Sequence, residues 1–226
     1  MLVVSLSLFP SNSTPVGHHI QVTNPPLTSE HMFVTLVTHE FPHPKGRSDI
    51  YLMPNETALL VIDMQVGLFE ELDSIDAGEG LLHRVQRLIT KARAAGCPVV
   101  YVQHNEGAGE PLETNTPAWS INPAIYPVDG DAVVQKFTPD AFYKTNLQDE
   151  LRRRGVTKLL ITGMQTNFCV DATSHRAHNL GYEVLVVEDA HNTGGQGGRT
   201  AEEIVNQYNE TFRSFAKVVP SDDIVF

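Results

Sequence analysis

The sequence predicts an α/β fold, a three-layer α/β/α domain built around a six-stranded, mostly parallel and Rossmann-like sheet. Two observations carry this prediction. Short apolar segments alternate along the chain with segments of helical periodicity, which is typical of right-handed βαβ units. The apolar segments also lack the polar alternation of half-exposed strands, as expected for parallel strands that are covered on both faces. With 226 residues, the chain is long enough for one full hydrophobic core.

Six strands and four helices follow from the pattern. The strands are predicted at residues 58–62, 99–102, 132–134, 158–162, 184–187 and 217–219. Apolar residues recur at helical spacing over residues 81–92, and further helices are expected at 147–153 and at about 169–180. Thr200 and Glu203 form a capping-box pattern, which predicts the start of the last long helix.

The chain divides near residue 53. Residues 10–56 contain seven prolines among many Ser, Thr, Asn and His residues and have almost no periodicity. We therefore predict an irregular or poorly ordered extension over residues 1–53 and the folded domain over residues 54–226. Met53 is an alternative start of the protein. Five histidines of the extension show no metal-ligand spacing: His18, His19, His31, His39 and His43.

Composition narrows the range of functions and locations. The formal net charge of -11 argues against a nucleic-acid partner, because such binding depends on clustered Lys and Arg. No apolar run approaches the length of a membrane span, so no membrane partner is expected. The two cysteines, Cys97 and Cys169, make no disulfide framework and favour a reducing, cytoplasmic location. An apolar run at residues 2–9 keeps secretion as the alternative, although no basic residue precedes it.

Three polar residues stand at or just after predicted strand ends. Asp63 closes the first strand, Lys136 closes the third, and Cys169 follows the fourth across a short turn. Each has an ordinary structural interpretation, as a turn residue, a solvated edge residue or a small core residue. Because the carboxyl ends of parallel strands share one edge of the sheet, we expect the three side chains to meet there.

This combination of residues suits nucleophilic catalysis. A cysteine attacks as the thiolate, which a neighbouring ammonium and a helix N-terminus both favour. Asp63 would accept the thiol proton and return it to a departing amine, while Lys136 would position both acidic groups. The sequence thus predicts a catalytic trio of Asp63, Lys136 and Cys169.

Three segments carry a resemblance to a known superfamily. The stretches ALLVIDMQ (58–65), VVQKFTPDAF (133–142) and ITGMQTNFCVD (161–171) resemble the signature segments of isochorismatase-like cysteine hydrolases. That superfamily includes nicotinamidases, N-carbamoylsarcosine amidases, ureido-acid amidohydrolases and streptothricin hydrolase. The resemblance implies a homodimer or homotetramer and a cis peptide bond between Met164 and Gln165. It also implies an oxyanion hole formed by the backbone N–H groups of Gln165 and Cys169.

The resemblance further narrows the expected reaction. Members that hydrolyse the vinyl ether of isochorismate lack the cysteine, so Cys169 favours hydrolysis of a C–N bond (amide, ureido or lactam) in a small molecule through a thioester. Two alternatives remain open: an isochorismatase, and a catalytically silent interaction module of the same fold. Nicotinamidases carry Asp-x-His and a further His for a metal, whereas His104 and Glu106 stand alone here. We therefore expect no metal and no cofactor.

The walls of a substrate pocket can be predicted from the residues around the strand ends. The candidate pocket residues are Gln65, Phe69, His104, Trp119, Phe142, Asn167 and Phe168.

Overall fold

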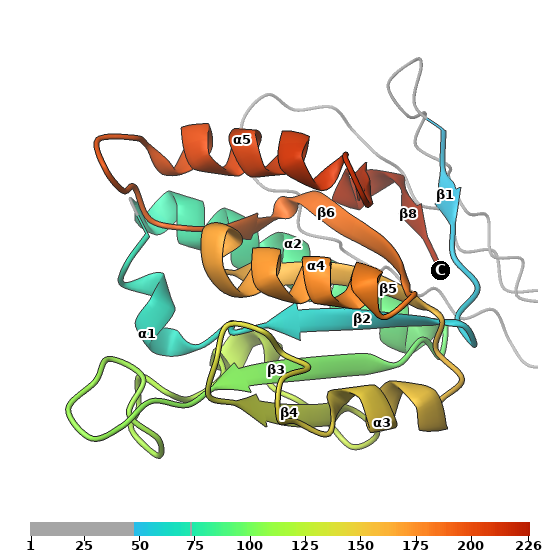
Figure 1. Ribbon diagram of the computed structural model, residues 1–226, viewed down its shortest axis with the longest axis horizontal. Helices are drawn as coiled ribbons and strands as arrows, with labels where there is room; N and C mark the ends of the chain where they lie inside the picture. Colours follow the sequence, from blue (N-terminus) through green and yellow to red (C-terminus); the bar gives the residue numbers. More distant parts are fainter. Residues whose placement is uncertain (1–47, 73) are drawn as a thin grey trace, which may run out of the picture. The chain divides into compact units, whose positions relative to one another are not determined.

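A six-stranded parallel sheet forms the centre of the described chain (Figure 1). The structure, a computed structural model, describes residues 48–72 and 74–226. The strands are β2 (Thr57–Ile62), β3 (Val99–His104), β4 (Ala132–Lys136), β5 (Lys158–Met164), β6 (Glu183–Asn192) and β7 (Lys217–Val219). Their order in the sheet is β4-β3-β2-β5-β6-β7, and every neighbouring pair is parallel. The predicted fold class is confirmed, and this sheet is parallel throughout.

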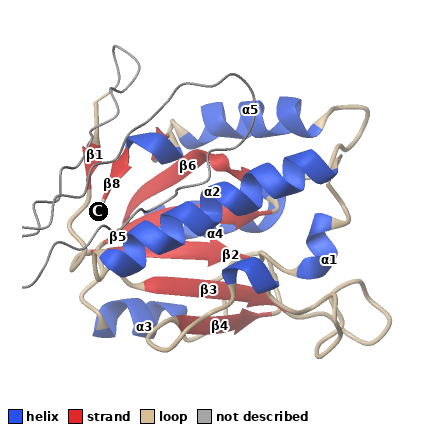
Figure 2. Cartoon of the chain, turned by 180° about the vertical axis from the view of Figure 1, so that it is seen from behind, coloured by secondary structure: helices blue, strands red, loops and turns tan. Residues whose placement is uncertain are grey.

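Helices cover both faces of the sheet (Figure 2). One face packs against α2 (Ile75–Ala94), whose apolar stripe includes Leu81, Val85 and Leu88. The other face packs against α3 (Leu147–Arg153), α4 (Asp171–Asn179) and α5 (Ala201–Phe212). Because both faces are covered, all six residues of β2 are buried, which explains its unbroken apolar sequence.

Short elements connect these layers. They are α1 (Val66–Phe69), the 3₁₀ turns η1 (Pro123–Ile125) and η3 (Ser221–Asp223), and the π-helical turn η2 (Thr166–Val170). The predicted helix at residues 169–180 therefore starts later, at Asp171, and Cys169 lies in the π-helical turn before it. The predicted capping box is present, since Thr200 and Glu203 exchange side-chain and backbone hydrogen bonds.

A second, two-stranded sheet lies outside the main one. It joins β1 (Ile50–Tyr51) in parallel with β8 (Ile224–Val225), and Leu52 is buried in the core beside it. Most of the predicted extension, residues 1–47 with its five histidines, falls outside the described residues. Its last residues, 50–52, pack as part of the domain.

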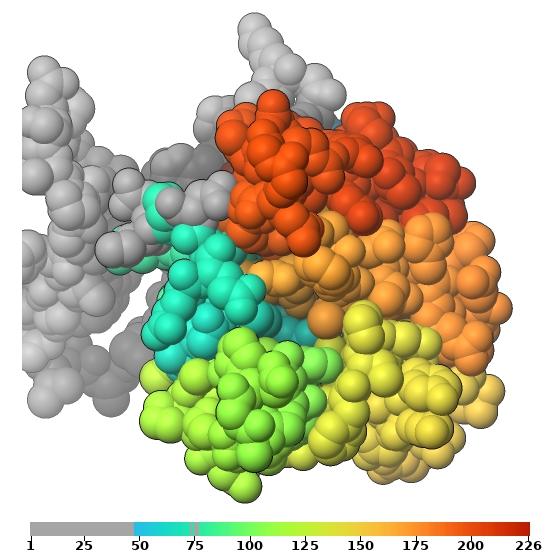
Figure 3. Space-filling model, turned by 60° about the vertical axis from the view of Figure 1, so that its left-hand side comes forward, coloured from blue at the N-terminus to red at the C-terminus, as the bar shows by residue number. Residues whose placement is uncertain are grey.

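The carboxyl ends of the sheet strands share one edge, and the loops that follow them form the candidate site. Figure 3 faces this edge and shows it hollowed where the cyan, green, yellow and orange segments meet. In the described part of the chain, no helix is both long and apolar enough to cross a membrane.

Candidate active site

Asp63 directly follows β2 and is completely buried. Its backbone adopts φ 47°, in the left-handed region that Asp tolerates better than most residues. The turn brings its carboxylate toward the neighbouring strand end, where Oδ2 lies 2.7 Å from the Nζ of Lys136. Asp63 and Lys136, which were predicted to be neighbours, thus form an ion pair in the structure.

Lys136 is the last residue of β4, and its side chain is also completely buried. Besides the Asp63 carboxylate, its Nζ contacts the Sγ of Cys169 at 3.2 Å and the Nδ1 of His104 at 3.0 Å. Burial lowers the pKa of Lys136, but its interactions with Asp63 and Cys169 outweigh this effect and the net pKa is raised. The group is therefore an ammonium ion that donates to its neighbours.

Cys169 lies in the π-helical turn, close to both partners. Burial raises the pKa of its thiol to about 12; the Asp63 carboxylate adds to the rise and the Lys136 ammonium opposes it. Lys136 favours the thiolate as expected, but burial and Asp63 outweigh its effect on the pKa. The thiol carries its proton at neutral pH, and the Asp63 carboxylate lies near enough to raise its pKa.

The turn before Cys169 is held tightly to the sheet. The Met164–Gln165 peptide bond is cis, at the position that the family resemblance implied. Gly163 just before it has φ 119°, and a Cβ on this residue would overlap the backbone oxygen of Ile62 on β2. Only glycine allows β5 to approach β2 this closely, so Gly163 fixes where the following turn, with Cys169, leaves the sheet.

The predicted pocket residues fall into two groups. Phe142 is 9% exposed and stacks on Tyr182 in the core, with ring centroids 5.9 Å apart. Gln65 is fully buried, where its Nε2 donates to the backbone oxygens of His104 and Trp119 at 2.9 and 2.8 Å. Gln65 therefore joins the end of β3 to the loop at Trp119, and Phe69 packs partly buried against the core.

The remaining predicted pocket residues reach cavities or the trio. Phe168 is 44% exposed and lines a polar cavity of about 380 Å³ with Glu71, Gln165 and Thr193. Asn167 holds the rim of this region, since its Oδ1 accepts from Thr193 at 2.7 Å and its Nδ2 donates to Gln196 at 3.1 Å.

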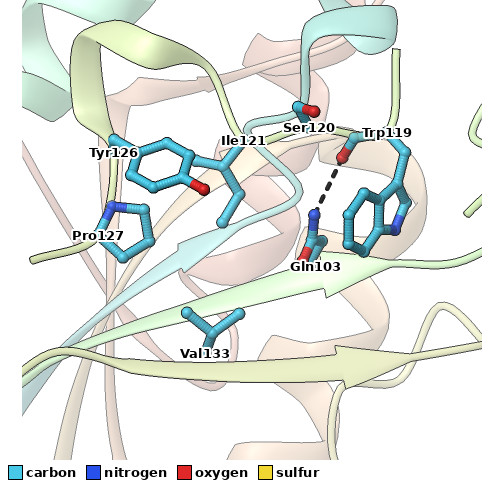
Figure 4. Close-up of a pocket in the computed structure, with 7 residues that line it drawn as sticks. All are labelled: Gln103, Trp119, Ser120, Ile121, Tyr126, Pro127 and Val133. Atoms are coloured by element: carbon cyan, nitrogen blue, oxygen red, sulfur yellow. Dashed lines mark hydrogen bonds between the residues drawn. The ribbon is translucent and has the colours of Figure 1, made fainter. Parts of the chain in front are cut away.

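Trp119 lines a different cavity, of about 180 Å³, between β3, β4 and the loop at residues 119–127 (Figure 4). Its Nε1 donates to Asn105 at 2.9 Å, and its backbone oxygen accepts from Gln103 at 3.0 Å. The lining also includes Tyr126 and Val133. Neither of these two cavities is lined by a member of the trio.

A buried network behind the nucleophile turn was not predicted. Thr166 lies 2.9 Å from the Nδ1 of His191, whose Nε2 lies 3.0 Å from the Oδ1 of Asn209. Burial lowers the pKa of His191 to about 4, so the ring is neutral, donates from Nε2 and accepts from Thr166. Only the fold brings these three residues together, and no spacing in the sequence marks them.

The Nε2 of His104 lies 3.7 Å from Oε1 of Glu106, the pair considered above as possible metal ligands. Within the described ranges, no group of three or more His, Cys, Asp or Glu side chains could hold a metal ion.

Comparison with known proteins identifies relatives of this arrangement. The isochorismatase domain family matches residues 57–223. Streptothricin hydrolase of Streptomyces noursei is 34% identical over 136 residues, which are 60% of this chain and 49% of the relative. The chain thus spans about half the length of that relative. The secreted isochorismatase effector Isc1 of Verticillium dahliae is 33% identical, over 75% of this chain and 90% of its own length.

Two further comparisons extend these findings. Ureidoacrylate amidohydrolase RutB of Agrobacterium fabrum is 29% identical, over 65% of this chain and 80% of its own length. The crystal structure of an isochorismatase from Pseudomonas putida aligns with a TM-score of 0.73 at 26% identity, and covers 80% of this chain and 95% of that one.

Proposed function

The chain belongs to the isochorismatase family, and from that premise we propose that this hydrolase cleaves a C–N bond of a small molecule through a thioester on Cys169. One observation carries the proposal: the buried ammonium group of Lys136 contacts both the carboxylate of Asp63 and the sulfur of Cys169. A base, a nucleophile and a cation in contact are what acyl transfer to sulfur requires. The names of two relatives, streptothricin hydrolase and ureidoacrylate amidohydrolase, agree with C–N chemistry.

The first half of the reaction forms the thioester. Asp63 takes the proton of the Cys169 thiol as Sγ bonds to the substrate's carbonyl carbon, and the carbonyl oxygen becomes an oxyanion. The backbone N–H groups of Gln165 and Cys169 are our candidates for its hydrogen-bond donors. Collapse of this intermediate breaks the C–N bond, and Asp63 returns the proton to the departing nitrogen.

The second half regenerates the enzyme. Water attacks the thioester carbon while Asp63 accepts a water proton. The C–S bond then breaks, an acid is released and the sulfur recovers a proton. The raised pKa of the thiol fits this cycle, since the nucleophile starts as the thiol and Asp63 is needed to take its proton. No metal or cofactor takes part in this scheme.

The test is a screen of small amides, ureido acids, lactams and isochorismate with the native protein and three variants. Cys169→Ala is expected to abolish hydrolysis, and Cys169→Ser nearly so, because a hydroxyl is much harder to deprotonate with a carboxylate. Asp63→Asn removes the proton carrier, for which losses of roughly a hundredfold or more are typical.

The screen also separates the alternatives. If Cys169→Ala kept the native rate on isochorismate, vinyl-ether hydrolysis would replace the thioester scheme. If the native protein turned over none of these compounds, the silent interaction module would gain support.

A further inference from the structure

The ammonium of Lys136 has a third partner that the catalytic scheme does not use. The Nζ has three close neighbours: it lies 2.7 Å from Oδ2 of Asp63 as an ion pair, and it is within hydrogen-bond distance of Cys169 Sγ at 3.2 Å and His104 Nδ1 at 3.0 Å. A lysine ammonium offers three donors and no acceptor, so these contacts use all of its hydrogen-bonding capacity. His104 ends β3, which lies between β4, the strand of Lys136, and β2, the strand that Asp63 follows.

The contact determines the protonation of the histidine. An ammonium can only donate to Nδ1, so the ring must be neutral with its proton on Nε2. That proton faces Glu106, whose Oε1 lies 3.7 Å from Nε2, while Oε2 of Glu106 accepts from the backbone N–H of Leu112 at 2.7 Å. A carboxylate on that side favours a proton on Nε2, which leaves Nδ1 free to accept.

From this geometry we infer that His104 is a positioning residue: as a neutral acceptor it fixes the rotation of the Lys136 ammonium, so that the other two N–H bonds point at Asp63 and Cys169. The inference rests on the proposed function, in which those two groups exchange a proton. Without a third acceptor, an ammonium on a long side chain can turn toward the carboxylate alone and leave the sulfur.

The charges around the imidazole define its response to acid. The Lys136 ammonium faces it from β4, the Asp63 carboxylate lies beyond that ammonium after β2, and Glu106 faces it from the loop after β3. Burial lowers the pKa of His104, and Lys136 lowers it further against the opposing effects of Asp63 and Glu106. Activity is therefore present above this pKa and lost as the pH falls through it, when imidazolium and ammonium would repel each other.

Three variants test the role. His104→Asn keeps an acceptor close to the position of Nδ1 but cannot gain a proton, whereas His104→Leu removes the acceptor. His83→Asn changes an exposed histidine of α2 and is the matched control. We expect His104→Leu to lower kcat/KM at least about tenfold, since small misplacements of catalytic groups are costly. His104→Asn should keep most of the activity and lose the acid limb that the histidine sets.

Two readouts do not need the substrate. Long-range ¹H–¹⁵N spectra of the native protein at pH 7 should show His104 as the neutral Nε2–H tautomer. Iodoacetamide should alkylate Cys169 more slowly in His104→Leu than in the native protein or in His104→Asn, with the modified site identified by peptide mapping.

An imidazolium or an Nδ1–H tautomer at pH 7 would overturn the inference, as would native kcat/KM, pH profile and alkylation in His104→Leu. If no compound is hydrolysed in a Cys169-dependent way, the proposed function fails instead, and the spectra and alkylation still decide the role of His104.

Discussion

A proton must leave Cys169 before its sulfur can attack, and the surroundings of the thiol keep that proton in place in the resting protein. Burial and the Asp63 carboxylate raise the pKa of the thiol, while Lys136 opposes them. These opposed effects of two neighbours allow a test that does not depend on the substrate.

We predict that Asp63→Asn and Lys136→Met change the reactivity of Cys169 in opposite directions. The thiol pKa is about 12, so alkylation by iodoacetamide should become roughly tenfold faster for each pH unit from 7 to 10. Asp63→Asn removes an effect that raises the pKa and should speed alkylation at pH 8, although turnover is lost. Lys136→Met removes the opposing charge and should slow alkylation.

Peptide mapping with mass spectrometry measures the label on each cysteine. Cys97 is an internal reference, since it is buried and burial raises its pKa to about 12 as well. A plateau in the rate for native Cys169 near neutral pH would contradict the prediction. Circular dichroism of each variant controls for loss of fold.

The trio could be located from the sequence because its three members share one kind of position. Asp63 and Cys169 follow apolar strands, Lys136 ends one, and parallel strands bring their carboxyl ends to one edge. The protonation of Cys169 could not be predicted, because it depends on how deeply the neighbouring loops bury it. The same limit applies to His191, whose partners Thr166 and Asn209 come from distant elements.

Among the elements, the link between β5 and the π-helical turn η2 restricts the backbone conformation most strictly. The starts of the strands were predicted to within about one residue, but β3, β4, β5 and β6 all end later than predicted. β5 and β6 continue because their backbones pair as far as Met164 and Asn192. The π-helical turn was missed, because its residues also suit the first turn of an α-helix.

We predict that Gly163→Ala destabilises the protein far more than Gly155→Ala. Both glycines have positive φ, of 119° and 70°, so both substitutions strain the backbone. At Gly155, after α3, no atom lies within 4 Å of the added Cβ, and the loss should be about 1 kcal/mol. At Gly163 the new Cβ overlaps β2, and the loss should exceed about 3 kcal/mol. Urea unfolding measures both, and equal losses would show that the close approach of β5 to β2 is unimportant.

On the scale of the whole molecule, the boundary of the domain lies further toward the N-terminus than composition alone suggests. We predict that removing residues 1–46 leaves the free energy of unfolding unchanged, whereas removing residues 1–53 lowers it. The longer deletion takes away β1 and the buried Leu52, and burial of one leucine side chain contributes about 1.5–3 kcal/mol. Urea unfolding of both truncated proteins measures the difference, and equal stabilities would contradict the assignment of β1 to the domain.

We also predict that the protein assembles into homodimers or homotetramers. This follows from the family resemblance, and large apolar side chains at the β4 side of the domain agree with it: Tyr126, Val133 and Phe137 are 64%, 43% and 74% exposed. Sedimentation equilibrium at micromolar concentration should give two or four times the chain mass of 24.9 kDa. A single species of one chain mass would contradict this prediction.

The order of the strands has a consequence for how the protein would lose activity. Lys136 belongs to β4, an edge strand that is paired only with β3 within the described residues, whereas Asp63 and Cys169 follow the two central strands β2 and β5. Edge strands open locally at a lower free energy than the centre of a sheet. Mild denaturant would therefore remove the ammonium from the site while the rest of the domain stays folded, and enzyme activity would disappear before the fold does. The hydrogen bonds between β3 and β4, and any surface that covers β4, therefore widen the range of denaturant concentrations over which the enzyme stays active.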